Sequence, residues 1–342
     1  MAIEPWLFVS FFPSDSKMHR PDPLLPPVIT RADYDSLRTR GDVWFEVMHI
    51  ICQRHGLPCE NLKRFGDGTD PADGNCVAFA AGKYHVIKLF PPYQRRLYQA
   101  ELVVAEHVFG RLRIATPEIF AHGAFDGWPY LVMSRMQGSY LSDIWDRLDQ
   151  FDQLHLVIEL AEVLAQLHAL PTNNLPYLDA DWMKFVEGRV NGCVQRHREQ
   201  GVLDYWLQQI PTFLAHASPL YPFDFPPAII SGDIHQYHLL AMPERGQWRL
   251  TGLFDFDDAL LGFCEYDLAA AGLFLMAGRS MLLRPFLLTY GYAASDLDEH
   301  ISHRLLAYTL LHRYRPFNWV REEFVKHSCS TLEELAEAIY LV

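Results

Sequence analysis

Two short segments of this 342-residue chain carry residue types that can move a proton and hold a cation. Residues 231–238 read SGDIHQYH, and residues 253–258 read LFDFDD. An aspartate can accept a proton from a hydroxyl group, and carboxylates and imidazoles bind divalent cations. Asp233, His238 and Asp255 are therefore candidates for chemistry if the fold brings them together.

The residues between the two segments predict a β-hairpin. The apolar runs HLLAM and WRLTGLFDF flank PERGQ, a turn-forming cluster with one proline and one glycine. The midpoint between positions 238 and 255 falls between Gly246 and Gln247, inside that turn. An antiparallel hairpin centred there places His238 roughly opposite Asp255, within a slip of a residue or two, and leaves Asp233 in the loop before it.

The composition restricts the class of protein. Half of the residues are hydrophobic, so the chain can bury a large core, and its length predicts two domains or lobes. The net charge of −13 argues against a generic nucleic-acid or membrane-surface binder, because both need clustered Lys and Arg. The six cysteines include no CxxC pair, which argues against a disulfide framework or a structural zinc site.

The N-terminal residues do not resemble a secretory signal. MAIEPWLFVSFFP is apolar but carries Glu4 and lacks a basic region before the apolar run. The longest apolar stretch, near DLAAAGLFLMAG, is too short to span a bilayer. We therefore expect a cytoplasmic protein that contacts neither membranes nor nucleic acid.

The elements that must position the candidates divide the chain into three parts. Residues 1–59 form a Pro-rich arm followed by helical spacing over 31–56, where Trp44, Val47, Met48 and Ile51 share a face. Residues 60–133 alternate between strands and glycine-rich turns, with a helix over roughly 93–112 and a turn at 125–127. Residues 134–342 are mostly helical, and the predicted hairpin lies within them.

The order and spacing of these motifs resemble the aminoglycoside phosphotransferase and choline kinase family. GDIHQYH and LFDFDDALLGFCEYDLA resemble its catalytic loop and metal motif. FGDGTDPADGNCVAFAAGKYHVIKLF is similar to its nucleotide-covering hairpin and lysine strand, and WPYLVMSRMQGSYLSDIW to its connector. The resemblance implies an α+β, two-lobed protein-kinase-like fold, with a small antiparallel-sheet lobe that binds nucleotide and a larger helical lobe with the catalytic loop and acceptor site.

The resemblance also implies an activity. The expected reaction is ATP-dependent transfer of the γ-phosphate to a hydroxyl group of a small molecule, such as an aminoglycoside-like, amino-alcohol or sugar-like acceptor. The alternative is a nucleotide-binding pseudokinase with a regulatory or binding role. A protein kinase is disfavoured, because no APE-like stretch follows DFD.

The implied catalytic roles follow the chemistry of phosphoryl transfer, in which positioning and charge neutralisation dominate. Asp233 would accept or orient the proton of the attacking hydroxyl. Asp255 would hold the divalent cation that accompanies ATP, Mg²⁺ or alternatively Mn²⁺. Lys88 would reach the α- and β-phosphates and pair with Glu101, with Glu106 as the alternative helix partner.

The remaining nucleotide contacts are expected from backbone groups. Gly66, Gly68 and Thr69 would let the backbone approach the phosphates closely. The backbone from Ser134 to Met136 would read the adenine edge.

One departure from the family pattern concerns the cation, because His238 stands where the family has a metal-binding Asn. Mg²⁺ prefers oxygen ligands, whereas imidazole suits Mn²⁺ and other transition metals. Three alternatives follow: His238 ligates a metal, with Mn²⁺ favoured; it hydrogen-bonds to Asp233 or a phosphate; or activity is lost. An HxxH metal pair of His235 and His238 is a further alternative, but no third ligand has a clear spacing. Two milder departures are Ser231, in place of a structural His, and Asp257, in place of the protein-kinase Gly.

The acceptor residues are harder to place. Carboxylates and aromatics suit a cationic polyol, and the candidates are Asp258, Glu265, Asp204, Trp319 and Glu322. For each of these residues, a position on the surface or in the packing is a simpler interpretation than contact with the acceptor. Two further expectations are structural, namely that Asp267 braces the catalytic loop and that His168 is a packed residue at a helix end.

Overall fold

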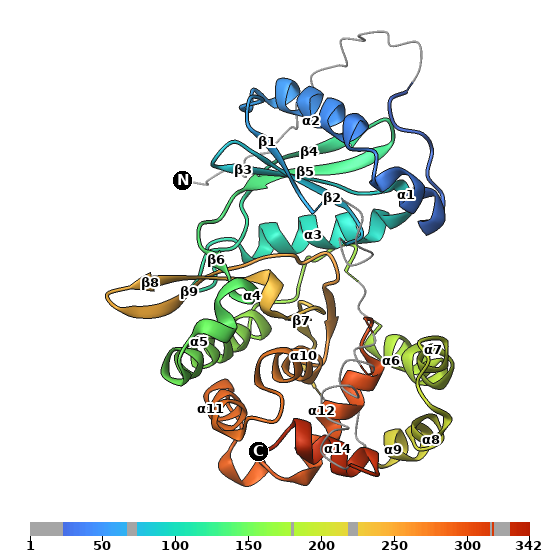
Figure 1. The fold of residues 1–342 in the computed structure, drawn as a ribbon, viewed down its shortest axis with the longest axis vertical. Coiled ribbons are helices and arrows are strands. Elements are labelled where there is room, and N and C mark those ends of the chain that lie inside the picture. Colours follow the sequence, from blue (N-terminus) through green and yellow to red (C-terminus); the bar gives the residue numbers. More distant parts are fainter. Residues whose placement is uncertain (1–22, 67–73, 179–180, 218–224, 315–316, 318–328) are drawn as a thin grey trace, which may run out of the picture.

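The computed structural model of the chain describes residues 23–66, 74–178, 181–217, 225–314, 317 and 329–342. These residues form two lobes, one built around a sheet and one mostly helical (Figure 1). Four of the predicted site residues lie outside the described residues, namely Gly68, Thr69, Trp319 and Glu322.

The smaller lobe contains a five-stranded antiparallel sheet in the order β1-β2-β3-β5-β4. Its strands are β1 (Leu62–Phe65), β2 (Val77–Ala81), β3 (His85–Leu89), β4 (Ile119–Phe125) and β5 (Trp128–Ser134). The turn predicted at 125–127 is confirmed: Asp126 and Gly127 both have positive φ, at 47° and 84°. Two such residues make the turn whose twist matches antiparallel strands.

Helices cover both faces of this sheet, with α2 (Gly41–His55) on one face and α3 (Arg95–Val108) on the other (Figure 1). The single helical segment expected over 31–56 is two helices, because α1 (Arg31–Arg38) ends before α2 begins. Gly41 at the junction is a poor helix former, and α2 starts there. The expected apolar face of α2 is confirmed, since Trp44, Val47, Met48 and Ile51 are completely buried.

The larger lobe consists mainly of helices packed around one core. They are α4 (Leu141–Ile144), α5 (Gln150–His168), α6 (Trp182–Asn191), α7 (Cys193–Glu199), α8 (Asp204–Leu207), α9 (Ile210–His216), α10 (Glu265–Met276), α11 (Ser280–Tyr290), α12 (Glu299–Leu311) and α14 (Leu332–Ile339). Short 3₁₀ turns occur at Pro92–Gln94, Trp145–Arg147, Gln236–His238 and Ala294–Asp296. α10 is apolar on nearly every side, which is why it lies in the middle of the lobe.

Two small sheets in this lobe frame the candidate residues. β7 (Ala228–Ile230) pairs with β10 (Leu260–Gly262), and β6 (Ser139–Tyr140), β8 (Leu239–Glu244) and β9 (Gln247–Leu253) form the second sheet. The predicted hairpin is confirmed as β8–β9, which turns at Arg245 and Gly246. The pairing register of the two strands shifts near Leu240, which is within the slip of a residue or two that the prediction allowed.

All six cysteines are free thiols. In the described part of the chain, no helix combines the length and the apolar character that a membrane crossing requires.

Candidate active site

The catalytic-loop candidate is the segment between β7 and β8, and α10 holds its backbone. The Asp267 side chain is completely buried, and its two oxygens accept hydrogen bonds from the amides of Ser231 (2.7 Å) and Gly232 (2.9 Å). Nε2 of His168, at the end of α5, lies 3.1 Å from the same carboxylate. These contacts confirm that Asp267 braces the loop and that His168 packs at a helix end.

The backbone at position 232 accommodates only a glycine. Its φ is +80°, and a Cβ atom there would lie 2.6 Å from the backbone oxygen of Asp258. A side chain is excluded both by this backbone conformation and by the close approach of the next loop. The glycine therefore allows the loop to present Asp233 at the edge of the site.

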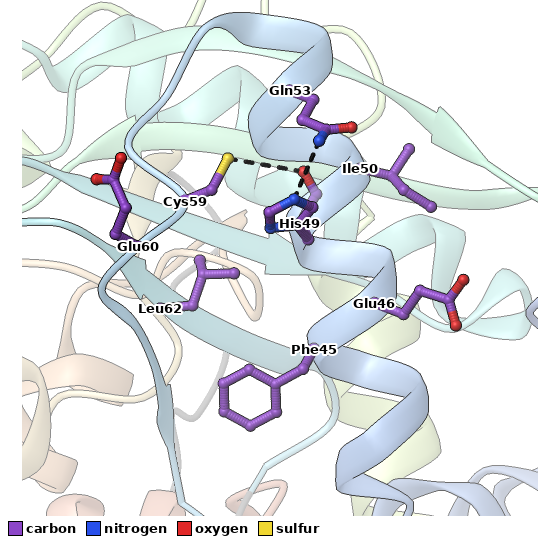
Figure 2. A pocket seen from close by; sticks show the side chains of 8 residues that line it. All are labelled: Phe45, Glu46, His49, Ile50, Gln53, Cys59, Glu60 and Leu62. Carbon is purple, nitrogen blue, oxygen red and sulfur yellow. Dashed lines mark hydrogen bonds between the residues drawn. The ribbon is translucent and has the colours of Figure 1, made fainter.

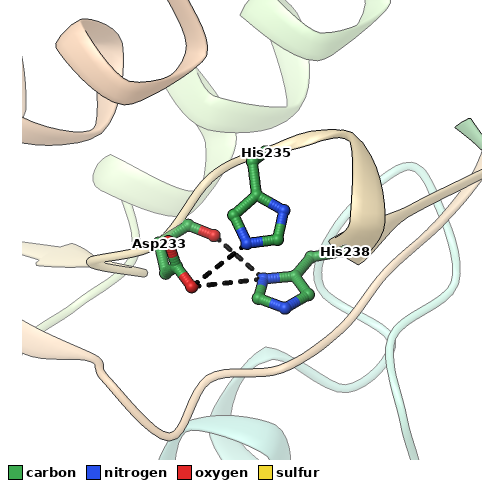
Figure 3. Close-up of side chains that lie close together, drawn as sticks. All are labelled: Asp233, His235 and His238. Carbon is green, nitrogen blue, oxygen red and sulfur yellow. Dashed lines mark hydrogen bonds and ion pairs between the residues drawn. The ribbon is translucent and has the colours of Figure 1, made fainter. Parts of the chain in front are cut away.

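Asp233 lies beside two imidazoles (Figure 3). Nε2 of His235 is 3.2 Å from Asp233 Oδ2, and Nδ1 of His238 is 3.0 Å from the Asp233 backbone oxygen. Burial opposes ionisation of Asp233, but the hydrogen bond from His235 and the neighbouring imidazoles outweigh it, so the pKa of Asp233 is lowered. Asp233 is therefore an ionised carboxylate that can orient a hydroxyl group.

Lys88 in β3 meets three carboxylates. Its Nζ lies 2.7 Å from Asp255 Oδ1, 3.0 Å from Glu101 Oε2 and 3.1 Å from Asp257 Oδ2. Glu101 in α3 also accepts a hydrogen bond from the amide of Phe256 (3.0 Å). The Lys88–Glu101 pair is thus present in the structure, and Glu101 ties α3 to the loop that carries Asp255.

The charges of this Lys88 cluster do not balance, because one ammonium faces three acids. Burial raises the pKa of Glu101 to about 7, and burial with the nearby Asp255 charge raises the pKa of Asp257. Burial also opposes ionisation of Asp255, but the Lys88 charge outweighs it and holds the pKa of Asp255 low. Asp255 is therefore the most readily ionised acid of the cluster and the one suited to receive a cation, whereas the pKa values of Glu101 and Asp257 are raised.

The donor set at Asp255 fits a divalent cation. Oδ2 of Asp255 lies 3.5 Å from Nε2 of His238, and Asp255 adopts a positive φ of 70°. Burial lowers the pKa of His238, which favours the neutral imidazole that binds metals. The ligating atoms of Asp233, His235 and His238 also lie within 4.8 Å of one another, as do those of Glu101, Asp255 and Asp257.

The backbone expected to read an adenine edge is partly engaged within the protein. The amide of Ser134 donates to the Glu118 oxygen (2.8 Å), and the amide of Arg135 donates to the Tyr84 oxygen (2.7 Å). An adenine would have to be read by other backbone groups between Ser134 and Met136. Gly66, at the end of β1, has the positive φ of 68° that favours glycine.

Two acceptor candidates, Asp258 and Glu265, are buried, and each forms an ion pair with an arginine. Nη1 of Arg313 lies 2.5 Å from Asp258 Oδ1, and the Tyr314 hydroxyl donates to the other oxygen. These contacts favour the packing interpretation for Asp258.

Glu265 is only 2% exposed and is held by Arg304 through Nη2 (2.9 Å) and Nε (3.0 Å). The Tyr292 hydroxyl also donates to Glu265 (2.8 Å). The packing interpretation is favoured here as well. Asp204, the third described candidate, is exposed at the start of α8.

Sequence reasoning missed several partners in this region. It treated Asp257 as a tolerated replacement, whereas the structure places its carboxylate on Lys88. It did not identify Arg313 and Arg304, which neutralise Asp258 and Glu265. A basic residue near an amphipathic helix is too common a signal to reveal either pairing.

A separate pocket of about 530 Å³ lies in the smaller lobe between α2 and β1 (Figure 2). It is lined by Phe45, Glu46, His49, Ile50, Gln53, Cys59, Glu60 and Leu62. Its volume is in the range of ligand sites, but none of the catalytic candidates lines it. Charge and hydrogen bonding, rather than volume, identify the candidate active site.

Comparisons with known proteins identify a family and a fold. A family described as "Phosphotransferase enzyme family" matches residues 80–306. An aminoglycoside 3'-phosphotransferase from Streptomyces ribosidificus is 26% identical over 208 residues, covering 56% of this chain and 73% of that protein.

Solved structures extend the similarity to the whole fold. The GDP complex of wild-type aminoglycoside 2'-phosphotransferase-IIIa has a TM-score of 0.62 at 19% identity, covering 86% of this chain and 97% of that one. The streptomycin–ATP complex of APH(2")-IIa has a TM-score of 0.54 at 15% identity, covering 86% and 96%. These similarities confirm the two-lobed α+β fold expected from the sequence.

Proposed function

The chain belongs to the phosphotransferase enzyme family, and from this premise we propose that it transfers the γ-phosphate of ATP to a hydroxyl group of a small molecule. The membership confirms the enzyme class that the motifs predicted. The observation that carries the finer proposal is the convergence of Asp233, Asp255 and the Lys88–Glu101 pair in one site.

Asp233 is assigned to the acceptor hydroxyl. His235 holds one oxygen of its carboxylate, and the bonds from Ser231 and Gly232 to Asp267 fix the loop. The carboxylate can therefore hold the hydroxyl in line with the phosphorus and take its proton as the new bond forms. Positioning of this kind supplies most of the catalysis in phosphoryl transfer.

Lys88 and Asp255 are assigned to the nucleotide. Glu101 holds the Lys88 ammonium beside Asp255. From this position, Lys88 can contact phosphate oxygens in place of Asp255. Asp255 and His238 would hold the divalent cation, which when bound neutralises charge on the phosphates. The unbalanced Lys88 cluster supports this exchange of partners, because Asp255 stays ionised.

The acceptor class is proposed from charge and from the relatives. The net charge of −13 favours a neutral or cationic acceptor over an anionic one. The relatives named above are aminoglycoside phosphotransferases, so aminoglycoside-like acceptors come first, followed by amino alcohols and sugars. Because ATP is the donor, we expect the enzyme to act in the cytoplasm.

The test is ADP release by the full chain with ATP, Mg²⁺ or Mn²⁺ and a panel of these acceptors, with the phosphorylated product identified by mass spectrometry. We expect acceptor-dependent product that is lost in Asp233→Asn while ATP still raises the melting temperature. Product formation that is undiminished in Asp233→Asn would remove the assigned base. Stabilisation by ATP without transfer to any acceptor would favour the pseudokinase alternative.

A further inference from the structure

The two histidines of the catalytic loop present different ring atoms to the site. We propose that His238 is a metal ligand that makes the cation site prefer Mn²⁺-like cations over Mg²⁺, whereas His235 is a positioning residue for Asp233. This inference rests on the proposed function, because the cation is the one that accompanies the nucleotide.

The tautomer of His238 follows from its backbone partner. A carbonyl oxygen can only accept, and the Asp233 carbonyl lies 3.0 Å from His238 Nδ1, so Nδ1 carries the proton and donates. The neutral ring then has its lone pair on Nε2. A backbone carbonyl that fixes the tautomer in this way is the usual support of a metal-binding histidine.

The lone pair of His238 faces another electron-pair donor. Nε2 is 3.5 Å from Asp255 Oδ2, and a cation between the two atoms would offset the repulsion of their lone pairs. Cation bonds of about 2.0–2.2 Å to each atom would place the two donors roughly 3–3.5 Å apart. The observed separation is therefore compatible with one cation shared by His238 and Asp255.

His235 has the opposite tautomer. The amide of Tyr237 can only donate, and it lies 3.2 Å from His235 Nδ1, so this nitrogen accepts. The proton of the neutral ring is then on Nε2, which donates to Asp233 Oδ2 at 3.2 Å. A cation at His235 Nε2 would have to displace this proton, which makes the Asp233–His235–His238 group a poorer metal site than its short distances indicate.

The donor pair sets the cation preference. Mg²⁺ demands near-ideal octahedral oxygen coordination, whereas an imidazole nitrogen beside a carboxylate suits Mn²⁺ and other transition metals. Replacing His238 with Asn exchanges the nitrogen donor for the amide oxygen of the residue that the family has at this position. The variant His238→Asn should therefore lose the preference without losing the cation.

The first experiment measures cation binding and not turnover. Mn²⁺ with saturating ADP is bound to the full chain, and pulsed electron paramagnetic resonance detects nitrogen next to the Mn²⁺ ion. We expect an imidazole nitrogen signal in the wild type and in His235→Gln, and its loss in His238→Asn. Titration calorimetry of ADP with Mn²⁺ and with Mg²⁺ should show the Mn²⁺:Mg²⁺ affinity ratio falling in His238→Asn by about 10- to 100-fold, the size of change in metal affinity that altering residues which support a metal site typically causes.

The positioning role of His235 has its own readout. His235→Gln should keep the Mn²⁺:Mg²⁺ affinity ratio and lower kcat while KM for ATP changes little, with an altered pH profile because the ring N–H that holds Asp233 is replaced by the amide of a more flexible side chain. Thermal unfolding identifies any variant that fails to fold, and His238→Gln then replaces His238→Asn.

The outcomes separate the two proposals. Loss of the nitrogen signal in His235→Gln as well as in His238→Asn would overturn the division of roles and favour the three-residue group. Mn²⁺–ADP binding with no nitrogen signal, or with an unchanged affinity ratio in His238→Asn, would overturn the inference and leave the proposed function standing. No ADP binding with either cation would instead remove the proposed function.

Discussion

Two groups of buried and half-buried carboxylates differ in the cations that neutralise them. In the Lys88 cluster, one ammonium contacts Glu101, Asp255 and Asp257. Glu265, by contrast, has its own guanidinium in Arg304 and a tyrosine donor. The first group has more acids than cations and the second does not.

This difference separates chemistry from support. A buried carboxylate that a guanidinium neutralises has little left to offer a ligand, although removing one partner leaves an uncompensated charge. A buried carboxylate in an unbalanced group can exchange its partner when a cation or phosphate arrives. We therefore expect substitutions in the active site to change turnover, and substitutions in the balanced pairs to change stability.

The largest expected effect concerns Asp233. Asp233→Asn should lower kcat by about 10²–10⁴-fold, because the amide cannot accept the hydroxyl proton. The melting temperature should change little. Asp149→Asn is the matched control, since Asn also caps the start of α5. A large loss of stability with normal kcat in Asp233→Asn would place Asp233 among the supporting carboxylates.

The second-largest effect is expected for Glu265→Ala, and it concerns stability. It should lower the free energy of unfolding by about 3–5 kcal/mol, because Arg304 would remain partly buried without its partner. Urea unfolding measures this, and the double variant Glu265→Leu with Arg304→Leu should recover part of the loss. If KM for the acceptor rises in the folded fraction while stability is kept, Glu265 belongs to the acceptor site.

Gly232→Ala tests the contact between the catalytic loop and the loop that carries Asp258. A Cβ atom would lie 2.6 Å from the Asp258 oxygen at a φ of +80°, so we expect a loss of more than about 1 kcal/mol in stability together with reduced kcat. Gly246→Ala is the control: its φ is also positive, at 85°, and nothing lies within 4 Å of a Cβ there. Equal effects of the two substitutions would argue against the close approach.

Asp257→Asn should give the smallest effect and a distinctive pH dependence. The pKa of Asp257 is raised above its usual 3.8, so the folded protein binds this proton more tightly than the unfolded chain does. Its contribution to stability is full below pH 3.8 and is lost as the pH rises through the raised pKa. Asn keeps the neutral form, so this loss should be absent and the variant at least as stable as wild type at pH 8.

Urea unfolding of Asp257→Asn and wild type at several pH values from 4 to 8 checks this difference. Glu101 remains in both proteins, so the difference between them reports the replacement of Asp257 together with the change that it causes in Glu101. Destabilisation of Asp257→Asn at pH 8 to the extent expected for Glu265→Ala would show that Asp257 is a balanced ion-pair partner of Lys88.

The sequence by itself determined the features that depend on short-range order. The turn-forming residues between positions 238 and 255 fixed a hairpin, and His238 Nε2 does lie 3.5 Å from Asp255. The contact between Lys88 and Glu101 joins a strand to the helix that follows it, and the family resemblance of the motifs predicted it, with Glu106 as the alternative partner. The roles assigned to these residues remain predictions.

Only the tertiary structure decided which carboxylates are neutralised and which are not. Asp258 meets Arg313 from 55 residues away, Glu265 meets Arg304 from 39, and Asp257 meets Lys88 from 169. Which of these distant residues meet depends on how the helices and lobes pack. The charge of one residue does not reveal its partner. The tautomers of His235 and His238 likewise follow from single backbone groups that come into reach only after the loop has folded.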